Sequence, residues 1–246
     1  MKIRFLLIFF VKKNFLYSLT DLFRMKKIGV ITIGQSPRPD VVGEILRVLG
    51  KEYEVVEKGA LDDYTAEEVK DIQLKPGEHL LVTKLRNGQE IKISHELVVS
   101  RIQSCVDFLE KTKVDIILLL CTGKFPEFNS KHLIIQPSEI VRGTVVASIR
   151  RGKLAVILPA REQIPKMTSN AYGAEVKIYY DSASPYGSIE ELKEMAKRVS
   201  KENVDLVFLN CMGFTHEMKL IVKDITNKPV IQSSSLVGRV IQEIVE

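Results

Sequence analysis

VDIILLLCTG, residues 114–123, is repeated as VDLVFLNCMG, residues 204–213, with a constant offset of 90 residues. Each copy begins with Val-Asp, continues as an apolar run and ends in a cysteine with a glycine two residues later, so Cys121 matches Cys211. An apolar run of this length that ends near glycine is typical of a buried parallel strand. The two copies therefore predict two equivalent strands, each with a thiol at its carboxyl end, where open α/β sheets bind their ligands.

A second match follows the first in the same order along the chain. IIQPS at residues 134–138 aligns with VIQSS at residues 230–234, and in both copies a short apolar strand ends in glutamine before a serine. Two matches in one order favour an internal duplication over chance. We therefore expect an α/β protein with two pseudo-symmetric domains, mostly parallel sheets and a cleft between them. Residues 25–138 and 234–246 would form the first domain, and residues 139–233 the second.

The rest of the chain alternates between strand and helix patterns, as in parallel sheets with crossover helices. Asn87-Gly88 is a strong signal for a hairpin between two short strands. Besides the two cysteine strands, strands are expected at residues 28–34, 53–61, 80–84, 90–94, 132–136, 154–160, 176–180 and 229–232. Helices are expected at residues 40–49, 96–111, 138–150, 162–172 and 188–200, and after the last strand.

Charge and cysteine content narrow the class of protein. The formal net charge is +5, but residues 1–24 carry five basic residues and one acidic residue, which leaves about +1 for the rest. That balance argues against a nucleic-acid partner. Three cysteines among strand and helix patterns indicate reduced thiols in the cytoplasm rather than a disulfide framework. The apolar run in residues 1–24 is too short to span a membrane, and we expect this segment to be an extension outside the fold.

The two matched cysteines suit acid–base chemistry. Inverting a carbon next to a carboxylate removes a proton from one face and adds one to the other, and Cys121 and Cys211 could serve as thiolate and thiol. We expect the loop after each cysteine to open a helix whose N-terminus favours the thiolate. The alternative is that both are small buried apolar residues, as we expect for Cys105 on the apolar face of a helix. Neither thiol has His or Cys at ligand spacing, so no metal site is expected.

Polar residues follow other predicted strands at the same edge of the sheets. A Gly-Gln-Ser loop offers N–H groups and a hydroxyl to an anion, and Arg38 can bind a carboxylate with two parallel hydrogen bonds. The alternative is a solvated turn stiffened by Pro37 and Pro39. The candidate substrate-binding residues are Gln35, Ser36, Arg38, Arg161, Ser233 and Ser234, with Thr122, Gly123 and Gly213 beside the cysteines.

Three motifs resemble those of one family: ITIGQSPRPD at residues 31–40, LLLCTG at residues 118–123 and FLNCMGF at residues 208–214. They closely resemble the AroM family, and the resemblance extends from Met25 to the C-terminus. That family looks like a branch of the aspartate/glutamate/hydantoin racemase superfamily. Its members have two pseudo-symmetric α/β domains with one catalytic cysteine from each in the cleft between them. The resemblance implies a scaffold that needs no cofactor, with Cys121 and Cys211 at the two cysteine positions.

The chain departs from the superfamily pattern in two places. Many members have Thr-His directly after the second cysteine, whereas here residues 212–214 precede Thr215 and His216. The Asn-Thr pair common after the first cysteine is replaced by Thr122-Gly123. These departures weaken the case for an amino-acid substrate but not the case for the two-thiol geometry.

We therefore expect a cofactor-independent isomerase, similar to a racemase or epimerase, that acts on a small anionic carboxylate. Two alternatives stay open. One is a decarboxylase or lyase on the same scaffold, in which one thiol protonates an enolate or acts as a nucleophile. The other is a non-catalytic protein that binds or senses a small anion. Neither nucleic acid nor a membrane is an expected partner, and a homodimer is left open.

Overall fold

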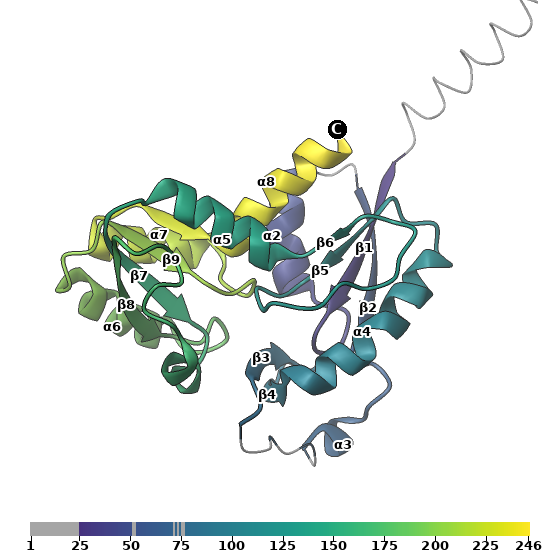
Figure 1. The fold of residues 1–246 in the computed structure, drawn as a ribbon. Helices are drawn as coiled ribbons and strands as arrows, with labels where there is room; N and C mark the ends of the chain where they lie inside the picture. The colour runs from purple at the N-terminus through teal and green to yellow at the C-terminus, as the bar shows by residue number, and fades with distance from the viewer. Residues whose placement is uncertain (1–24, 51–52, 71, 73, 75–76) are drawn as a thin grey trace, which may run out of the picture.

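The computed structural model describes residues 25–50, 53–70, 72, 74 and 77–246 (Figure 1). The extension expected at residues 1–24 lies outside the described residues. The strands are β1 (Lys26–Thr32), β2 (Tyr53–Gly59), β3 (Leu80–Lys84), β4 (Glu90–Ser94), β5 (Ile116–Leu119), β6 (Ile134–Ile135), β7 (Gly152–Leu158), β8 (Val176–Ser182), β9 (Leu206–Leu209) and β10 (Val230–Gln232). The helices are α2 (Pro39–Leu49), α3 (Ala66–Lys70), α4 (His95–Glu110), α5 (Pro137–Ser148), the 3₁₀ helix η1 (Arg161–Lys166), α6 (Ile189–Ser200), α7 (His216–Thr226) and α8 (Ser233–Val245).

Two four-stranded parallel sheets carry the duplication that the sequence predicts. The first has the strand order β2-β1-β5-β6, and the second, read in the equivalent direction, has the order β8-β7-β9-β10. The central pairs share one register, because Ile28 of β1 lies opposite Ile116 and Leu154 of β7 lies opposite Leu206. The predicted α/β architecture of two pseudo-symmetric halves with mostly parallel sheets is therefore confirmed.

A shared apolar core joins the two halves. One face of each sheet contributes to it, with Val30 from the first and Phe208 from the second, together with α2 and α8. These two helices pack together (Figure 1), and a Cβ added to Gly238 of α8 would lie only 3.1 Å from the Cβ of Val48 on α2. The opposite faces pack against α4 in the first half and against α6 and α7 in the second. Both faces of both sheets are thus covered, which explains the continuous apolar runs in the sequence.

The hairpin β3–β4 extends from the first half to the second. Its two strands are antiparallel, and the turn contains Gly88 at a positive φ of 86°. From η1 in the second half, the Gln163 side chain donates to the carbonyl of Leu80 at 3.1 Å. Lys92 of the hairpin forms an ion pair with Glu162 at 2.5 Å. The hairpin therefore forms one wall of the space between the two sheets.

The structure differs from the expected elements in the second half. The helix expected at residues 162–172 is wrong beyond Lys166: only the 3₁₀ helix η1 forms, and it contains Pro165, which cannot donate a backbone hydrogen bond. A helix does follow the Cys211 loop, as expected, but α7 begins only at His216. Among the helices that the structure describes, none has the length and apolarity needed to cross a membrane. The division of the chain into domains at residues 138 and 234 stays a prediction.

Candidate active site

The two matched cysteines occupy equivalent positions just beyond the carboxyl ends of β5 and β9. In both loops the N–H of the glycine two residues later donates to the thiol sulfur, at 3.3 Å from Gly123 to Cys121 and at 3.4 Å from Gly213 to Cys211. The two loops also touch each other, because the Thr122 hydroxyl donates to the carbonyl of Asn210 at 3.4 Å. The duplication therefore places two similar thiol environments side by side.

One cavity of about 490 Å³ is lined by both cysteines. Six of the candidate site residues line it: Arg38, Cys121, Thr122, Gly123, Cys211 and Gly213. Most of the remaining wall near the sulfurs is apolar, with Leu120 and Leu158 at the strand ends and Leu81 from the hairpin. A cavity of this size suits a small molecule with an apolar part.

Both thiols are held in the protonated form. Burial raises the pKa of Cys121 to about 12 and that of Cys211 to about 11, although the glycine N–H groups act in the opposite direction. A charge on Cys211 raises the pKa of Cys121 further. The expectation that helix N-termini favour the thiolates is wrong. Residues 121–133 contain no helix, α7 begins only at His216, and burial outweighs the local amides.

Cys105 lies away from this site, as the sequence predicts. It is 1% exposed on the apolar face of α4, within the core that covers the outer face of the first sheet. Burial raises its pKa to about 11. It provides an internal reference for the chemistry of the other two thiols.

Arg38 reaches the cavity with its guanidinium already engaged. The Nε and one terminal nitrogen donate to the two carboxylate oxygens of Asp40, both at 2.9 Å, and the other terminal nitrogen donates to the Thr83 hydroxyl at 3.2 Å. Its backbone N–H donates to the Glu57 carboxylate at 2.7 Å. The paired hydrogen bonds that the sequence suggested for a substrate carboxylate are thus made to Asp40. Arg38 keeps its positive charge, but contacts within the protein fix the orientation of the guanidinium.

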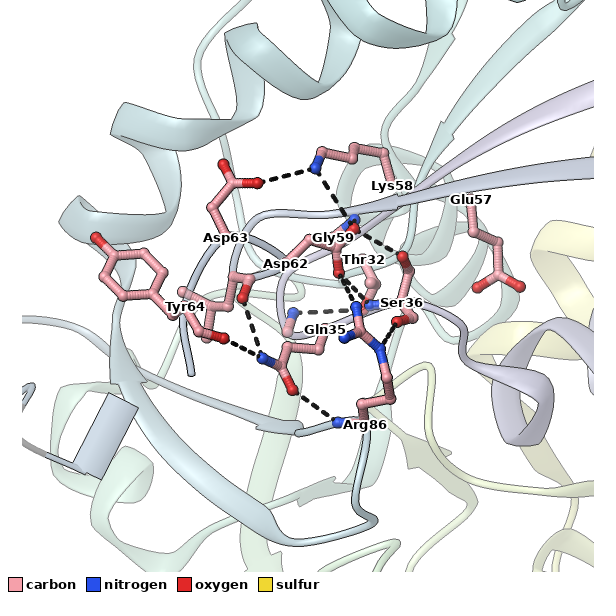
Figure 2. A network of polar contacts seen from close by, with 12 residues as sticks. Thr32, Gln35, Ser36, Glu57, Lys58, Gly59, Asp62, Asp63, Tyr64 and Arg86 are labelled. Atoms are coloured by element: carbon pink, nitrogen blue, oxygen red, sulfur yellow. Dashed lines mark hydrogen bonds and ion pairs between the residues drawn. The ribbon is translucent and has the colours of Figure 1, made fainter. Parts of the chain in front are cut away.

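Gln35 and Ser36 do not line the cavity but belong to a polar network behind it (Figure 2). The Gln35 amide donates to the carbonyls of Leu61 and Tyr64 at 3.2 and 2.7 Å and accepts from the N–H of Arg86 at 2.9 Å. Both the N–H and the hydroxyl of Ser36 donate to the Asp62 carboxylate at 2.7 Å. These contacts fasten the loop that carries Arg38 to the turn after β2 and to the hairpin.

The remaining candidates also lie outside the cavity lining. The Ser233 hydroxyl donates to the carbonyl of Leu209, and that of Ser234 donates to the carbonyl of Phe214, at 2.9 and 3.1 Å. Both serines are fully buried and hold the strand and loop that carry Cys211. Arg161 is exposed at the start of η1.

Tyr186 and Asn210 line the cavity without having been predicted from the sequence. Asn210 directly precedes Cys211, where the repeat alone could have drawn attention to it. Tyr186 lies in the loop after β8, and nothing in the local sequence distinguishes it from the other tyrosines. Over the described residues, no group of three or more His, Cys, Asp or Glu side chains is arranged to hold a metal ion.

Several solved structures share this fold at low sequence identity. Maleate cis-trans isomerase from Nocardia farcinica matches with a TM-score of 0.59 and 12% identity over 89% of this chain and 91% of that chain. Glutamate racemase RacE1 from Bacillus anthracis matches with a TM-score of 0.57 and 16% identity, over 89% of this chain and 81% of that chain. Unliganded arylmalonate decarboxylase matches with a TM-score of 0.54 and 14% identity, over 89% of this chain and 92% of that chain. At these identities the likeness shows the fold alone.

The sequence comparison places the chain in a family. No protein with curated function matches it significantly. The model of the AroM protein family matches residues 28–245, which include both cysteine loops and the Arg38 loop. The chain therefore belongs to the AroM family, on an α/β scaffold similar to those of racemases, a decarboxylase and a cis-trans isomerase.

Proposed function

We propose that the protein is a cofactor-independent isomerase, similar to a racemase or epimerase, in which Cys121 and Cys211 exchange protons with a small carboxylate. One observation carries the proposal: two thiols from equivalent loops line the same cavity. Proton removal on one face and delivery on the other needs an acid and a base on opposite sides of the carbon. A duplicated fold supplies such a pair by symmetry.

The raised pKa values shape how the two thiols would work. A thiol with a pKa of about 11 or 12 is a good reservoir of protons but is rarely a thiolate at neutral pH. One of the two thiols must therefore lose its proton to water as substrate binds, before it can act as the base. The N–H groups of Gly123 and Gly213 are already directed at the sulfurs and would stabilise whichever thiolate forms.

A decarboxylase is the second candidate, and the same pKa shifts favour it. Loss of carbon dioxide from a substituted malonate leaves an enolate, which needs one proton and no base. A thiol kept protonated by burial is suited to supply that proton. The fold of arylmalonate decarboxylase is similar to that of this chain, and this reaction would use one cysteine rather than two.

Proton exchange in heavy water distinguishes these functions. Amino acids, hydroxy acids, aryl-substituted carboxylates and aryl-substituted malonates would be incubated with the wild type, Cys121→Ser, Cys211→Ser and the control Cys105→Ala. Exchange at the α-carbon together with net inversion supports the isomerase, provided that inversion is lost in both Ser variants and kept in the control. Release of carbon dioxide from malonates, lost in one Ser variant only, supports the decarboxylase. Full activity in both Ser variants excludes both thiol mechanisms.

A protein that only binds or senses a small anion gives a different pattern. No exchange and no carbon dioxide release would be seen with any member of the panel, while a carboxylate would still shift the melting temperature. That result would overturn the isomerase proposal.

A further inference from the structure

Tyr186 connects the two halves of the molecule inside the cavity. It lies in the loop between β8 and α6, and its hydroxyl accepts a hydrogen bond at 2.9 Å from the Arg38 guanidinium of the first half. Its ring lies near two cations, with the guanidinium carbon of Arg38 5.3 Å and the Nζ of Lys84 4.6 Å from the ring centre. The phenol is thus held by one hydrogen bond and two nearby cations, and its position is set by protein contacts before any ligand binds.

The hydrogen bonds of Tyr186 leave its own proton free. A phenol can accept and donate at once, whereas a guanidinium can only donate. Arg38 therefore occupies a lone pair of the hydroxyl oxygen and not its hydrogen. In the described part of the chain no acceptor takes that hydrogen, although the side chain lines the cavity. The hydroxyl is thus a half-buried donor at the cavity wall that is free to bind a ligand there.

Tyr186 stands directly beside the loop of Cys211. A Cβ added to Gly213 would lie 2.7 Å from the Tyr186 hydroxyl oxygen, so the hydroxyl lies against the backbone that donates to the sulfur. Burial and the nearby Cys211 raise the pKa of the phenol above its usual range, so it remains a neutral donor. The hydroxyl and the thiol therefore approach the same small volume.

We propose that Tyr186 donates a hydrogen bond to a carboxylate oxygen of the ligand at Cys211, with Arg38 behind it strengthening the donor. This inference rests on the proposed function, in which a proton leaves the carbon next to that carboxylate. Negative charge then moves onto the carboxylate oxygens, and a donor fixed in advance stabilises it without rearrangement. Arg38 acts through Tyr186, since its own forked face is bound to Asp40.

The test compares two reagents that alkylate the same sulfur. Iodoacetate and iodoacetamide both lose iodide to a thiolate, but only iodoacetate places a carboxylate next to the carbon that is attacked. The folded wild type, Tyr186→Phe and the control Tyr180→Phe would be treated with each reagent at pH 9. Mass spectrometry would follow Cys211, with Cys121 as internal reference. Tyr180 donates to the carbonyl of Thr168 and does not line the cavity.

We expect the wild type to show a higher iodoacetate-to-iodoacetamide rate ratio at Cys211 than Tyr186→Phe, by roughly tenfold, as for a hydrogen bond to a charged group. The ratio should be unchanged at Cys121 and in Tyr180→Phe. An equal ratio in wild type and Tyr186→Phe overturns the inference, and so does a Cys211 that neither reagent reaches. A change of equal size at both cysteines would show a general loss of structure and would also overturn it.

This readout needs no turnover, so it separates the inference from the proposed function. If the cysteine variants keep full exchange activity but the ratio falls in Tyr186→Phe, the carboxylate site stands and the two-thiol mechanism fails. If the ratio stays constant while the cysteine variants lose net isomerisation, the mechanism stands and Tyr186 has no part in it. With a substrate found by the heavy-water panel, Tyr186→Phe should lower kcat by about 10²–10³-fold.

Discussion

The loops around Cys121 and Cys211 are alike in backbone and different in their electrostatic surroundings. Both follow one of the two central strands of a four-stranded parallel sheet, and both receive a glycine N–H at the sulfur. The charge of Arg38 lowers the pKa of Cys211 and that of Glu90 raises it, whereas the pKa of Cys121 is raised further by its partner thiol. Duplication reproduces the position of a thiol but not its electrostatic environment, so the two cysteines are not interchangeable.

Removing one thiol at a time should have the largest effect and tests whether the two cysteines have different roles. We expect Cys121→Ser and Cys211→Ser each to lower net isomerisation by about 10²–10⁴-fold, because each removes a general acid or base. Each variant should still exchange the proton of one enantiomer, and the two variants should retain opposite enantiomers. NMR of each enantiomer in heavy water measures this. If both variants retain the same enantiomer, the thiols do not serve opposite faces.

The two equivalent glycines offer a matched test of packing. An added Cβ at Gly213 would lie 2.7 Å from the Tyr186 oxygen and 2.9 Å from Pro185, whereas at Gly123 the nearest atom is 3.3 Å away. Gly213→Ala should therefore cost about 1–3 kcal/mol of unfolding free energy, as for other overpacked sites. Gly123→Ala should cost less than about 1 kcal/mol. Urea unfolding of the two variants compares them, and equal costs would mean that Tyr186 moves aside freely.

Alkylation rates measure the electrostatic difference between Cys121 and Cys211. Thiolate is the reactive form, so each rate should rise about tenfold per pH unit below the pKa of that thiol. With pKa values of about 11 and 12, Cys211 should react up to about tenfold faster with iodoacetamide than Cys121 at any pH below both values. Both should react faster than Cys105, which does not line the cavity. Peptide mapping between pH 8 and 10 gives the three rates. A faster reaction at Cys121 would contradict the prediction that Cys211 has the lower pKa of the two.

The smallest effect is expected where the two loops touch. The hydrogen bond from Thr122 to the carbonyl of Asn210 is long, at 3.4 Å, and the matching position in the other loop is the apolar Met212. Thr122→Val should therefore cost at most about 1 kcal/mol of stability and should leave the labelling of both thiols within a factor of two. A larger loss, seen by thermal unfolding, would show that this contact sets the distance between the loops.

Much of the architecture could be predicted because it depends on local patterns. Apolar runs predict buried parallel strands, and Asn87-Gly88 predicts the hairpin that β3 and β4 form. The repeat at an offset of 90 residues placed both cysteines at equivalent strand ends. The helix expected at residues 162–172 is wrong beyond Lys166, where the segment that contains Pro165 forms only a short 3₁₀ helix.

The site was predictable only in part because several contacts in it are made between distant segments. Gln35 and Ser36 lie at the strand end where ligand groups gather, but their side chains bind residues 26 to 51 positions away. Arg38 has its acceptor only two residues away in Asp40, yet that pairing depends on how the loop folds. Tyr186 meets Arg38 across 148 residues. The spacing of residues within one helix or strand cannot predict contacts of this kind.

The pairing of α2 with α8 has a consequence for synthesis on the ribosome. Chains emerge amino end first and domains tend to fold as they appear. The apolar face of α2, with Val41 and Ile45, is covered by α8, whose Val237 and Ile241 belong to the same core. The nascent chain must therefore keep α2 uncovered until more than 180 further residues have been made. The amino-terminal sheet can form early, but its inner face is completed only when α8 docks onto α2.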